Sequence, residues 1–208
     1  INETINENVT SLAGVPSWMM VLLQKTLETT GKSNLLELWP NAEVYFHGGV
    51  NFDPYREQYK KLFPKDDFKY YEIYNASEGF FAIQDQNNSN ELLLMLDYGI
   101  FYEFIPLEQY GRFDSAQQPL FERLTLKEVE LNKDYALILT TNSGLWAYSI
   151  GDVVRFISKN PHRILVSGRT KHFTSAFGEH VIAFEVEEAM KATVEKFPAQ
   201  ITEFHLAP

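Results

Sequence analysis

A polar segment near the middle of the sequence, YNASEG at residues 74–79, carries side chains that can bind phosphate and metal. The Ser77 hydroxyl can contact a phosphate, and the Glu78 carboxylate offers the hard oxygen that Mg²⁺ prefers. The segment follows an aromatic run that predicts a strand, and ligands of α/β sheets bind outside the carboxyl ends of strands. The alternative is an ordinary polar loop that ends at Gly79, and the segment alone favours neither interpretation.

Two further segments carry a carboxylate and a guanidinium. Asp152 follows YSIG and begins a predicted strand, and a carboxylate in that place can accept two hydroxyl hydrogen bonds from a ribose diol. Arg169 follows the next predicted strand, and its forked donors suit phosphate or ribose oxygens. The alternatives are a Gly-Asp turn between strands and a surface arginine.

A glycine pair in the segment HGGV follows an earlier predicted strand. Gly48 and Gly49 have no Cβ, so the backbone there, together with Val50, can approach a flat ligand closely. A turn out of a strand also requires glycine, and the pair alone favours that structural explanation.

The elements that must position these residues alternate between helices and strands in the first third of the chain. Pro16 opens a helix that runs to Gly31, and Asp53-Pro54 predicts a second helix through about Phe63, with Asp53 as N-cap. Short strands punctuated by Asn, Gly, Pro and Asp follow. One short strand, ending in the glycine pair, is predicted between the two helices at 42–49, and the others are predicted at 68–74, 80–84, 91–96, 100–105, 135–141, 152–158 and 163–168.

After Gly168 the pattern changes to a turn-rich connection, a helix over 180–197 and a strand over 201–206. The prediction is an α/β fold in which a mixed sheet with helices is followed by an antiparallel sheet or barrel. Residues 1–170 are predicted to form part of a large N-terminal domain, and residues 171–208 a hinge and the beginning of a small α+β C-terminal domain.

Composition limits the classes of function. Hydrophobic residues make up 45% of the 208, which is the range of globular proteins. The net charge of −10, from 18 basic and 28 acidic residues, opposes binding to nucleic acid or to an anionic membrane. There is no cysteine, which excludes disulfides and thiolate chemistry. With no signal peptide and no apolar run near ~20 residues, the chain is predicted to be soluble and cytoplasmic.

Taken in order, the motifs GGV, YNASEG, GLWAYSIGDVVRF and LVSGRTKHFTSAFGE resemble the adenylate-forming superfamily of acyl-CoA synthetases and luciferase. The phrases TTNSGLWAYSIGDVV and GRTKHFTSAFGE resemble more narrowly the auxin-responsive acyl acid-amido synthetase family. The resemblance covers nearly the whole chain.

The resemblance implies a role for each matching position. Gly48, Gly49 and Val50 would lie against adenine, with Tyr74 packed near the base. Ser77 would contact phosphate and Glu78 would bind Mg²⁺, which makes both of them catalytic. Asp152 would bind the ribose, Arg169 would face the nucleotide, and a hinge would fall at 171–173. These matches are, in order, Gly48, Gly49, Val50, Tyr74, Ser77, Glu78, Asp152 and Arg169.

The chain also departs from the superfamily pattern. Ser149 stands where many members have Arg, so no role is assigned to it. The phosphate loop and the late catalytic Lys are not found, the sequence begins without Met and it stops after a predicted strand. We therefore expect a piece cut at both ends, with little activity by itself.

The implied function is that of a ligase. With ATP and Mg²⁺ it would adenylate a carboxylic acid and conjugate it to an amino acid, releasing AMP. The alternative is a non-catalytic relative that binds a nucleotide or an acyl acid, and a weaker one is a hydrolase using Glu78 and Glu103. Aromatic residues that could line an acyl pocket, but that could equally be core, are Phe80, Phe101, Tyr102 and Trp146.

Overall fold

The computed structural model describes residues 1–86, 89–170, 173–176 and 179–197. It divides into two compact units, one formed by Ile1–Tyr74 with Glu187–Leu206 and the other by Asn75–Val186 with Ala207–Pro208. We call them unit 1 and unit 2. This division follows contacts between residues, and the predicted domain boundary near residue 170 stays a prediction.

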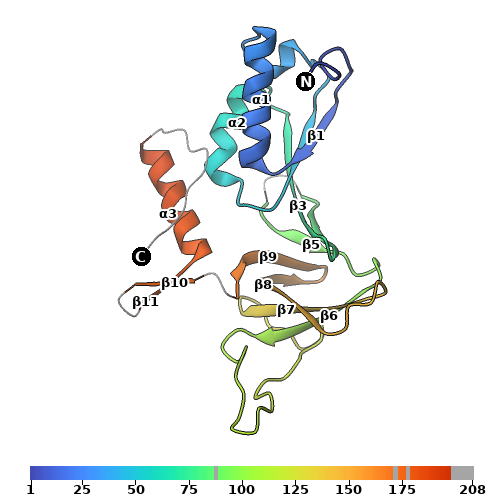
Figure 1. The fold of residues 1–208 in the computed structure, drawn as a ribbon, viewed down its shortest axis with the longest axis vertical. Coiled ribbons are helices and arrows are strands. Elements are labelled where there is room, and N and C mark those ends of the chain that lie inside the picture. The colour runs from blue at the N-terminus through green and yellow to red at the C-terminus, as the bar shows by residue number, and fades with distance from the viewer. Residues whose placement is uncertain (87–88, 171–172, 177–178, 198–208) are drawn as a thin grey trace. The chain divides into compact units, whose positions relative to one another are not determined.

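Unit 1 contains a small parallel sheet, the helices α1 and α2, and the part of α3 (Ala183–Lys196) from Glu187 onward. Its strand order is β1-β2-β3, and β2 pairs in parallel with both neighbours. Figure 1 shows α1 and α2 beside these strands. The elements are β1 (Ser11–Gly14), α1 (Pro16–Thr30), η1 (Leu35–Glu37), β2 (Val44–His47), η2 (Asp53–Tyr55), α2 (Arg56–Leu62) and β3 (Lys69–Ala76), whose last two residues belong to unit 2.

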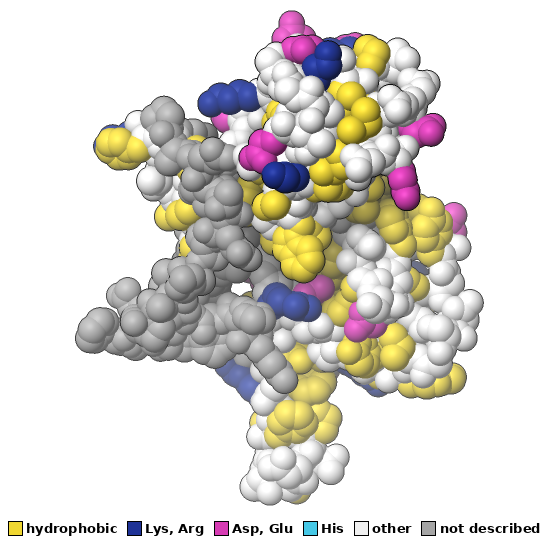
Figure 2. Space-filling view, turned by 45° about the horizontal axis from the view of Figure 1, so that its top comes forward, with side chains coloured by type: hydrophobic (Ala, Val, Ile, Leu, Met, Phe, Trp, Pro, Cys, Tyr) yellow, Lys and Arg dark blue, Asp and Glu magenta, His cyan; other side chains and the backbone are white. Residues whose placement is uncertain are grey.

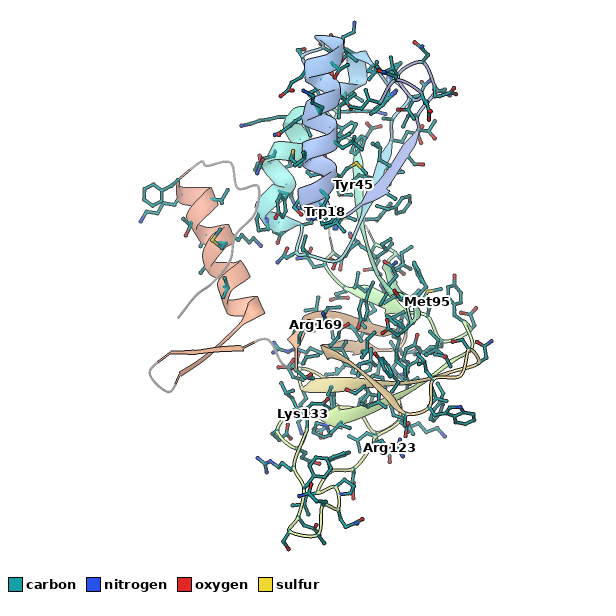
Figure 3. The ribbon with its side chains drawn as sticks, viewed as in Figure 1. Trp18, Tyr45, Met95, Arg123, Lys133 and Arg169 are labelled. Atoms are coloured by element: carbon teal, nitrogen blue, oxygen red, sulfur yellow. The ribbon has the colours of Figure 1, made fainter. Side chains whose placement is uncertain are left out.

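Aromatic side chains hold unit 1 together. Tyr45 of β2 and Tyr59 of α2 are fully buried and stack with their ring centroids 4.7 Å apart. The Tyr59 hydroxyl contacts the carbonyl oxygen of Pro16 at 2.9 Å and the hydroxyl of Tyr45 at 3.2 Å, so one phenol joins both helices to the sheet. Buried polar groups need such partners, and these bonds therefore fix how α2 packs. Figure 3 labels Tyr45 in this core.

Unit 2 is an antiparallel sheet with the strand order β4-β5-β9-β8-β7-β6. The central strand β7 reads DYALILTT, and five consecutive residues of it are buried, as expected for a strand covered on both faces. Figure 1 shows the long loop between β6 and β7 extending away from this sheet. The strands are β4 (Gly79–Gln84), β5 (Leu92–Leu94), β6 (Ile100–Pro106), β7 (Asp134–Thr141), β8 (Tyr148–Lys159) and β9 (His162–Arg169).

The part of the chain after β9 differs from the sequence-based prediction. The turn-rich connection contains two antiparallel strands, β10 (Phe173–Ala176) and β11 (Glu179–Ile182). The helix begins later than predicted, as α3 (Ala183–Lys196), because its first three expected residues are used by β11. The predicted strand over 201–206 and part of the predicted hinge, residues 171 and 172, lie outside the described residues.

The prediction of Asp53 as a helix N-cap is wrong. Asp53 is the first residue of η2, and its carboxylate is bonded to Arg56 at 3.1 Å and to Lys191 at 3.1 Å. The ion pairs place the acidic oxygens beside side-chain cations instead of backbone N–H groups. By contrast, the helix predicted from Pro16 to Gly31 is confirmed, with Gly31 at φ +66° closing it.

The surface of α1 carries exposed hydrophobic side chains. Trp18, Val21 and Leu22 recur at helical spacing and are 77%, 60% and 48% exposed. Figure 2 shows hydrophobic side chains on the visible face, with charged groups around them. None of the helices in the described part of the chain is both long and apolar enough to span a bilayer.

Candidate nucleotide site

The predicted phosphate and metal segment forms the tight turn between β3 and β4. Ser77 and Glu78 are the two residues outside both strands, with Ser77 exposed and Glu78 half-buried. The hydroxyl of Tyr148, the first residue of β8, donates to Glu78 Oε1 at 3.2 Å. This hydrogen bond, and secondarily the negative charge of Glu78, raise the pKa of the Tyr148 phenol. The Glu78 carboxylate is therefore held by a side chain of the motif GLWAYSIGDVVRF, which also contains Asp152.

The predicted ribose acid and the predicted nucleotide arginine face each other. Asp152 of β8 and Arg169 of β9 are direct partners in the antiparallel register, and Arg169 Nε donates to Asp152 Oδ1 at 2.8 Å. The Asp152 side chain is 11% exposed and that of Arg169 is 54% exposed. The guanidinium is thus anchored through Nε, while more than half of the Arg169 side chain, labelled in Figure 3, is exposed.

The backbone around Asp152 is irregular. Gly151 has φ +88°, a left-handed conformation that glycine adopts without a steric cost. The register between β8 and β9 also shifts between Val153 and Val154, and such a bulge changes the direction of the side chains around it. Only a glycine before the acid gives this local geometry without strain.

Unit 1 holds the glycine pair. A Cβ on Gly48 would lie 2.4 Å from the carbonyl oxygen of Ile73 in β3, so the neighbouring strand requires glycine there. Gly49 has φ +82°, and Val50 is 40% exposed. Tyr74 is buried, with 9% of its surface exposed. These contacts support the structural explanation for Gly48 and leave the adenine contact of the segment a prediction.

His47, directly before the glycine pair, is a buried titratable side chain. It is 2% exposed and its ring stacks on Phe52 with centroids 4.1 Å apart. Neither ring nitrogen has a hydrogen-bond partner among the described residues. Burial, and secondarily the charge of Arg56, lower the pKa of His47 to about 3, while Asp53 acts in the opposite direction. The imidazole is therefore neutral at physiological pH.

The predicted site residues are divided between the two units. Gly48, Gly49, Val50 and Tyr74 belong to unit 1. Ser77, Glu78, Asp152 and Arg169 belong to unit 2, where the pairs Glu78–Tyr148 and Asp152–Arg169 both include β8. Sequence reasoning assigned no role to Tyr148. Its place four residues before Asp152 on the same strand was the available signal.

The other candidates have different surroundings. Glu103 of β6, the second acid of the hydrolase alternative, forms an ion pair with Arg123 at 3.2 Å. Glu78 is bonded instead to Tyr148. Tyr102 is core, being 3% exposed with its hydroxyl bonded to the carbonyl oxygen of Met95. Phe101 and Trp146 are 57% and 82% exposed, so they are not core side chains.

The donor set fits a Mg·nucleotide more closely than a protein-built metal cage. No group of three or more possible metal-binding side chains occurs within the described residues. Mg²⁺ commonly uses one or two carboxylates and takes its other ligands from phosphates and water. A single half-buried carboxylate such as Glu78 is compatible with that arrangement.

Solved structures share this fold. The AtGH3.15 acyl acid amido synthetase in complex with 2,4-DB matches with a TM-score of 0.70 at 16% identity, over 92% of this chain and 42% of that chain. The 2-hydroxyisobutyryl-CoA ligase in the postadenylation state, in complex with R3-HIB-AMP, matches with a TM-score of 0.60 at 13% identity, over 89% of this chain and 38% of that chain. The predicted α/β fold, with a mixed sheet shared with these adenylate-forming enzymes, is confirmed.

Sequence relatives agree with the structural ones. Indole-3-acetic acid-amido synthetase GH3.15 of Arabidopsis thaliana is 30% identical over 173 residues, which is 75% of this chain and 27% of the relative. Indole-3-acetic acid-amido synthetase GH3.4 of the same plant is 30% identical over 132 residues, 58% of this chain and 20% of the relative. The chain spans about a quarter of the length of these curated relatives.

Family models account for most of the described chain. The GH3 family N-terminal domain matches residues 1–68, and the GH3 family central domain matches residues 93–169. Two successive domains of one family therefore occur in the order expected of a single protein. Together they match more than half of the sequence, and the chain belongs to the GH3 family of acyl acid amido synthetases.

Proposed function

We propose that this chain supplies nucleotide-binding residues to an ATP-dependent acyl acid-amido synthetase. The pair Asp152–Arg169 is the observation that carries the proposal. A nearly buried carboxylate beside an accessible guanidinium offers acceptors for ribose hydroxyls and donors for phosphate oxygens in one place. Family membership supports the same chemistry, because indole-3-acetic acid-amido synthetases are among the relatives.

In the proposed reaction, a carboxylate oxygen of the acid attacks the α-phosphorus of ATP and the bond to pyrophosphate breaks. The amine of an amino acid then attacks the acyl carbon of the acyl-adenylate, loses a proton, and displaces AMP. Asp152 would hold the ribose, Ser77 and Arg169 would contact phosphate oxygens, and Glu78 would bind Mg²⁺. The metal would supply charge neutralisation at the phosphates.

Within unit 1, the segment formed by Gly48, Gly49 and Val50 would contact the adenine base. Gly48 and Gly49 leave the backbone uncovered by Cβ atoms, and Val50 offers an exposed apolar surface. A flat base packs readily on such a backbone. Small-molecule acids and amino acids are the proposed substrates, and the net charge of −10 opposes nucleic acid and anionic membranes as partners.

The test is ATP–pyrophosphate exchange by the complete gene product with a panel of carboxylic acids. We expect exchange that requires both an acid and Mg²⁺, and that Asp152→Ala and Glu78→Ala abolish. Nucleotide binding without exchange by any acid would instead identify a non-catalytic relative. Asp134→Ala is not a suitable control, because the bonds between Asp134 and Arg155 join β7 to β8. Lys133→Ala is a suitable control, because Lys133 is exposed directly before β7 and pairs with the exposed Glu130.

A further inference from the structure

The turn that carries Glu78 and the strand that carries Asp152 are joined by one side-chain hydrogen bond. The donor is the phenol of Tyr148 and the acceptor is Glu78 Oε1, 3.2 Å away. Tyr148 is 70 residues distant in sequence, so the bond is a tertiary contact and not part of the turn. It uses one carboxylate oxygen, and a carboxylate has lone pairs on both oxygens for other ligands.

The direction of the Tyr148 side chain is fixed by the backbone before it. Ala147 has φ +46°, a conformation that residues with a Cβ rarely adopt. Its N–H donates to the hydroxyl oxygen of Thr140 in β7 at 3.0 Å, and Tyr148 pairs with Leu139 of the same strand. The phenol therefore projects from a defined point of the sheet and not from a freely rotating loop.

From this geometry we propose that Tyr148 is the positioning residue of Glu78. By donating to one oxygen, it holds the carboxylate in one orientation, and the other oxygen would remain to bind the metal of a Mg·nucleotide. Partners of this kind commonly set the affinity of a metal site, since they fix the ligand before the metal arrives. The inference rests on the proposed function, because it assumes that Glu78 binds the metal.

The next residue provides a matched control. The Ser149 hydroxyl and the Tyr110 hydroxyl are hydrogen-bonded at 2.8 Å, at the same end of β8. Tyr110→Phe therefore removes a phenol hydroxyl that contacts the same end of β8, and it leaves the bond between Tyr148 and Glu78 in place. Tyr148→Phe removes only the oxygen that donates to Glu78. The two variants differ in the bond that is lost and not in the kind of substitution.

The test is a titration of Mn²⁺, as a paramagnetic substitute for Mg²⁺, into the complete gene product with a non-hydrolysable ATP analogue. Electron paramagnetic resonance measures the free ion. We expect Tyr148→Phe to weaken Mn²⁺ binding about tenfold, the lower end for loss of such a partner. Tyr110→Phe should leave it unchanged. Glu78→Gln should weaken it at least as much as Tyr148→Phe, and adding Tyr148→Phe to Glu78→Gln should cause little further loss.

Other outcomes separate the two hypotheses. If Glu78→Gln weakens Mn²⁺ binding but Tyr148→Phe behaves as Tyr110→Phe does, the positioning role is wrong and the proposed function stands. If Tyr148→Phe weakens binding of the ATP analogue equally with and without metal, Tyr148 contacts the nucleotide itself, and this result also overturns the inference. If Glu78→Gln has no effect, the metal role of Glu78 fails, and the inference fails with it. Circular dichroism and the unfolding temperature establish that each variant is folded.

Discussion

Replacing His47 by phenylalanine should make unit 1 less sensitive to acid. The imidazole is 2% exposed, its nitrogens have no hydrogen-bond partner among the described residues, and burial lowers its pKa to about 3. In the unfolded chain the ring would titrate near its ordinary value of 6.5. The unfolded state therefore binds more protons than the folded state at pH values between about 3 and 6.5.

The sign and size of the effect follow from this difference. The part of the free energy of unfolding that depends on His47 is fully present above pH 6.5 and is lost progressively as the pH falls toward 3. The loss is at most about 1.4 kcal/mol per pH unit, so lowering the pH from about 7.5 to about 5.0 should cost about 2 kcal/mol. The pKa of Asp53, held below its usual value chiefly by Lys191 and Arg56 against its own burial, keeps that carboxylate ionised throughout this window.

The assay is urea unfolding at several pH values, for the original chain and for His47→Phe. Trp39 is buried in unit 1 and its fluorescence reports on that unit. Subtracting one stability curve from the other removes any constant change in packing and leaves the part that depends on His47. His162→Phe, which changes a half-buried histidine of unit 2, serves as the control.

A flat difference curve between about pH 7.5 and 5.0 would refute the reasoning, since linkage requires a slope there. Nuclear magnetic resonance of ¹³C-labelled histidine gives an independent measurement. A folded-state titration of His47 near 6.5 would show that water reaches the ring, contrary to its burial in the structure.

Three substitutions test other contacts by urea unfolding. Gly48→Ala should destabilise unit 1 by about 1–3 kcal/mol, because the new methyl group would overlap the carbonyl of Ile73; an unchanged midpoint would contradict this. Tyr59→Phe should cost about 1 kcal/mol through loss of its two hydroxyl contacts, and a neutral result would mean that they add nothing net. Asp134→Ala should cost about 2 kcal/mol, since the guanidinium of Arg155, bonded at 2.9 and 2.6 Å, would lose its partner; equal stability in high salt and low salt for both proteins would argue against an ionic contribution.

Local sequence signals predicted most elements of this fold. Pro16 and Gly31 bound α1 because proline has no N–H to lose in a first turn and glycine accepts the left-handed closing conformation. The strands of unit 2 were predicted by short apolar runs between turn residues. These signals act over a few residues, so the sequence displays them directly.

Local signals failed where distant side chains compete for the same group. Asp53 is a residue type that favours helix N-caps and it directly precedes a proline, yet Arg56 and Lys191 bind its carboxylate. The segment after Gly168 looked turn-rich, although β10 and β11 pair with each other within it. Pairing between strands supplies hydrogen-bond partners for backbone N–H and C=O groups, and the residue pattern of a single segment does not reveal these partners.

The sequence alone determined which residue types could form a nucleotide site and the family to which they point. Only the tertiary structure decided their partners: β8 and β9 bring Asp152 opposite Arg169, and the start of β8 brings Tyr148 to Glu78. The physical reason is that register and side-chain direction depend on how strands pair across the sheet, including the bulge after Asp152. The motifs specify the chemistry available, and the strand pairing specifies which groups meet.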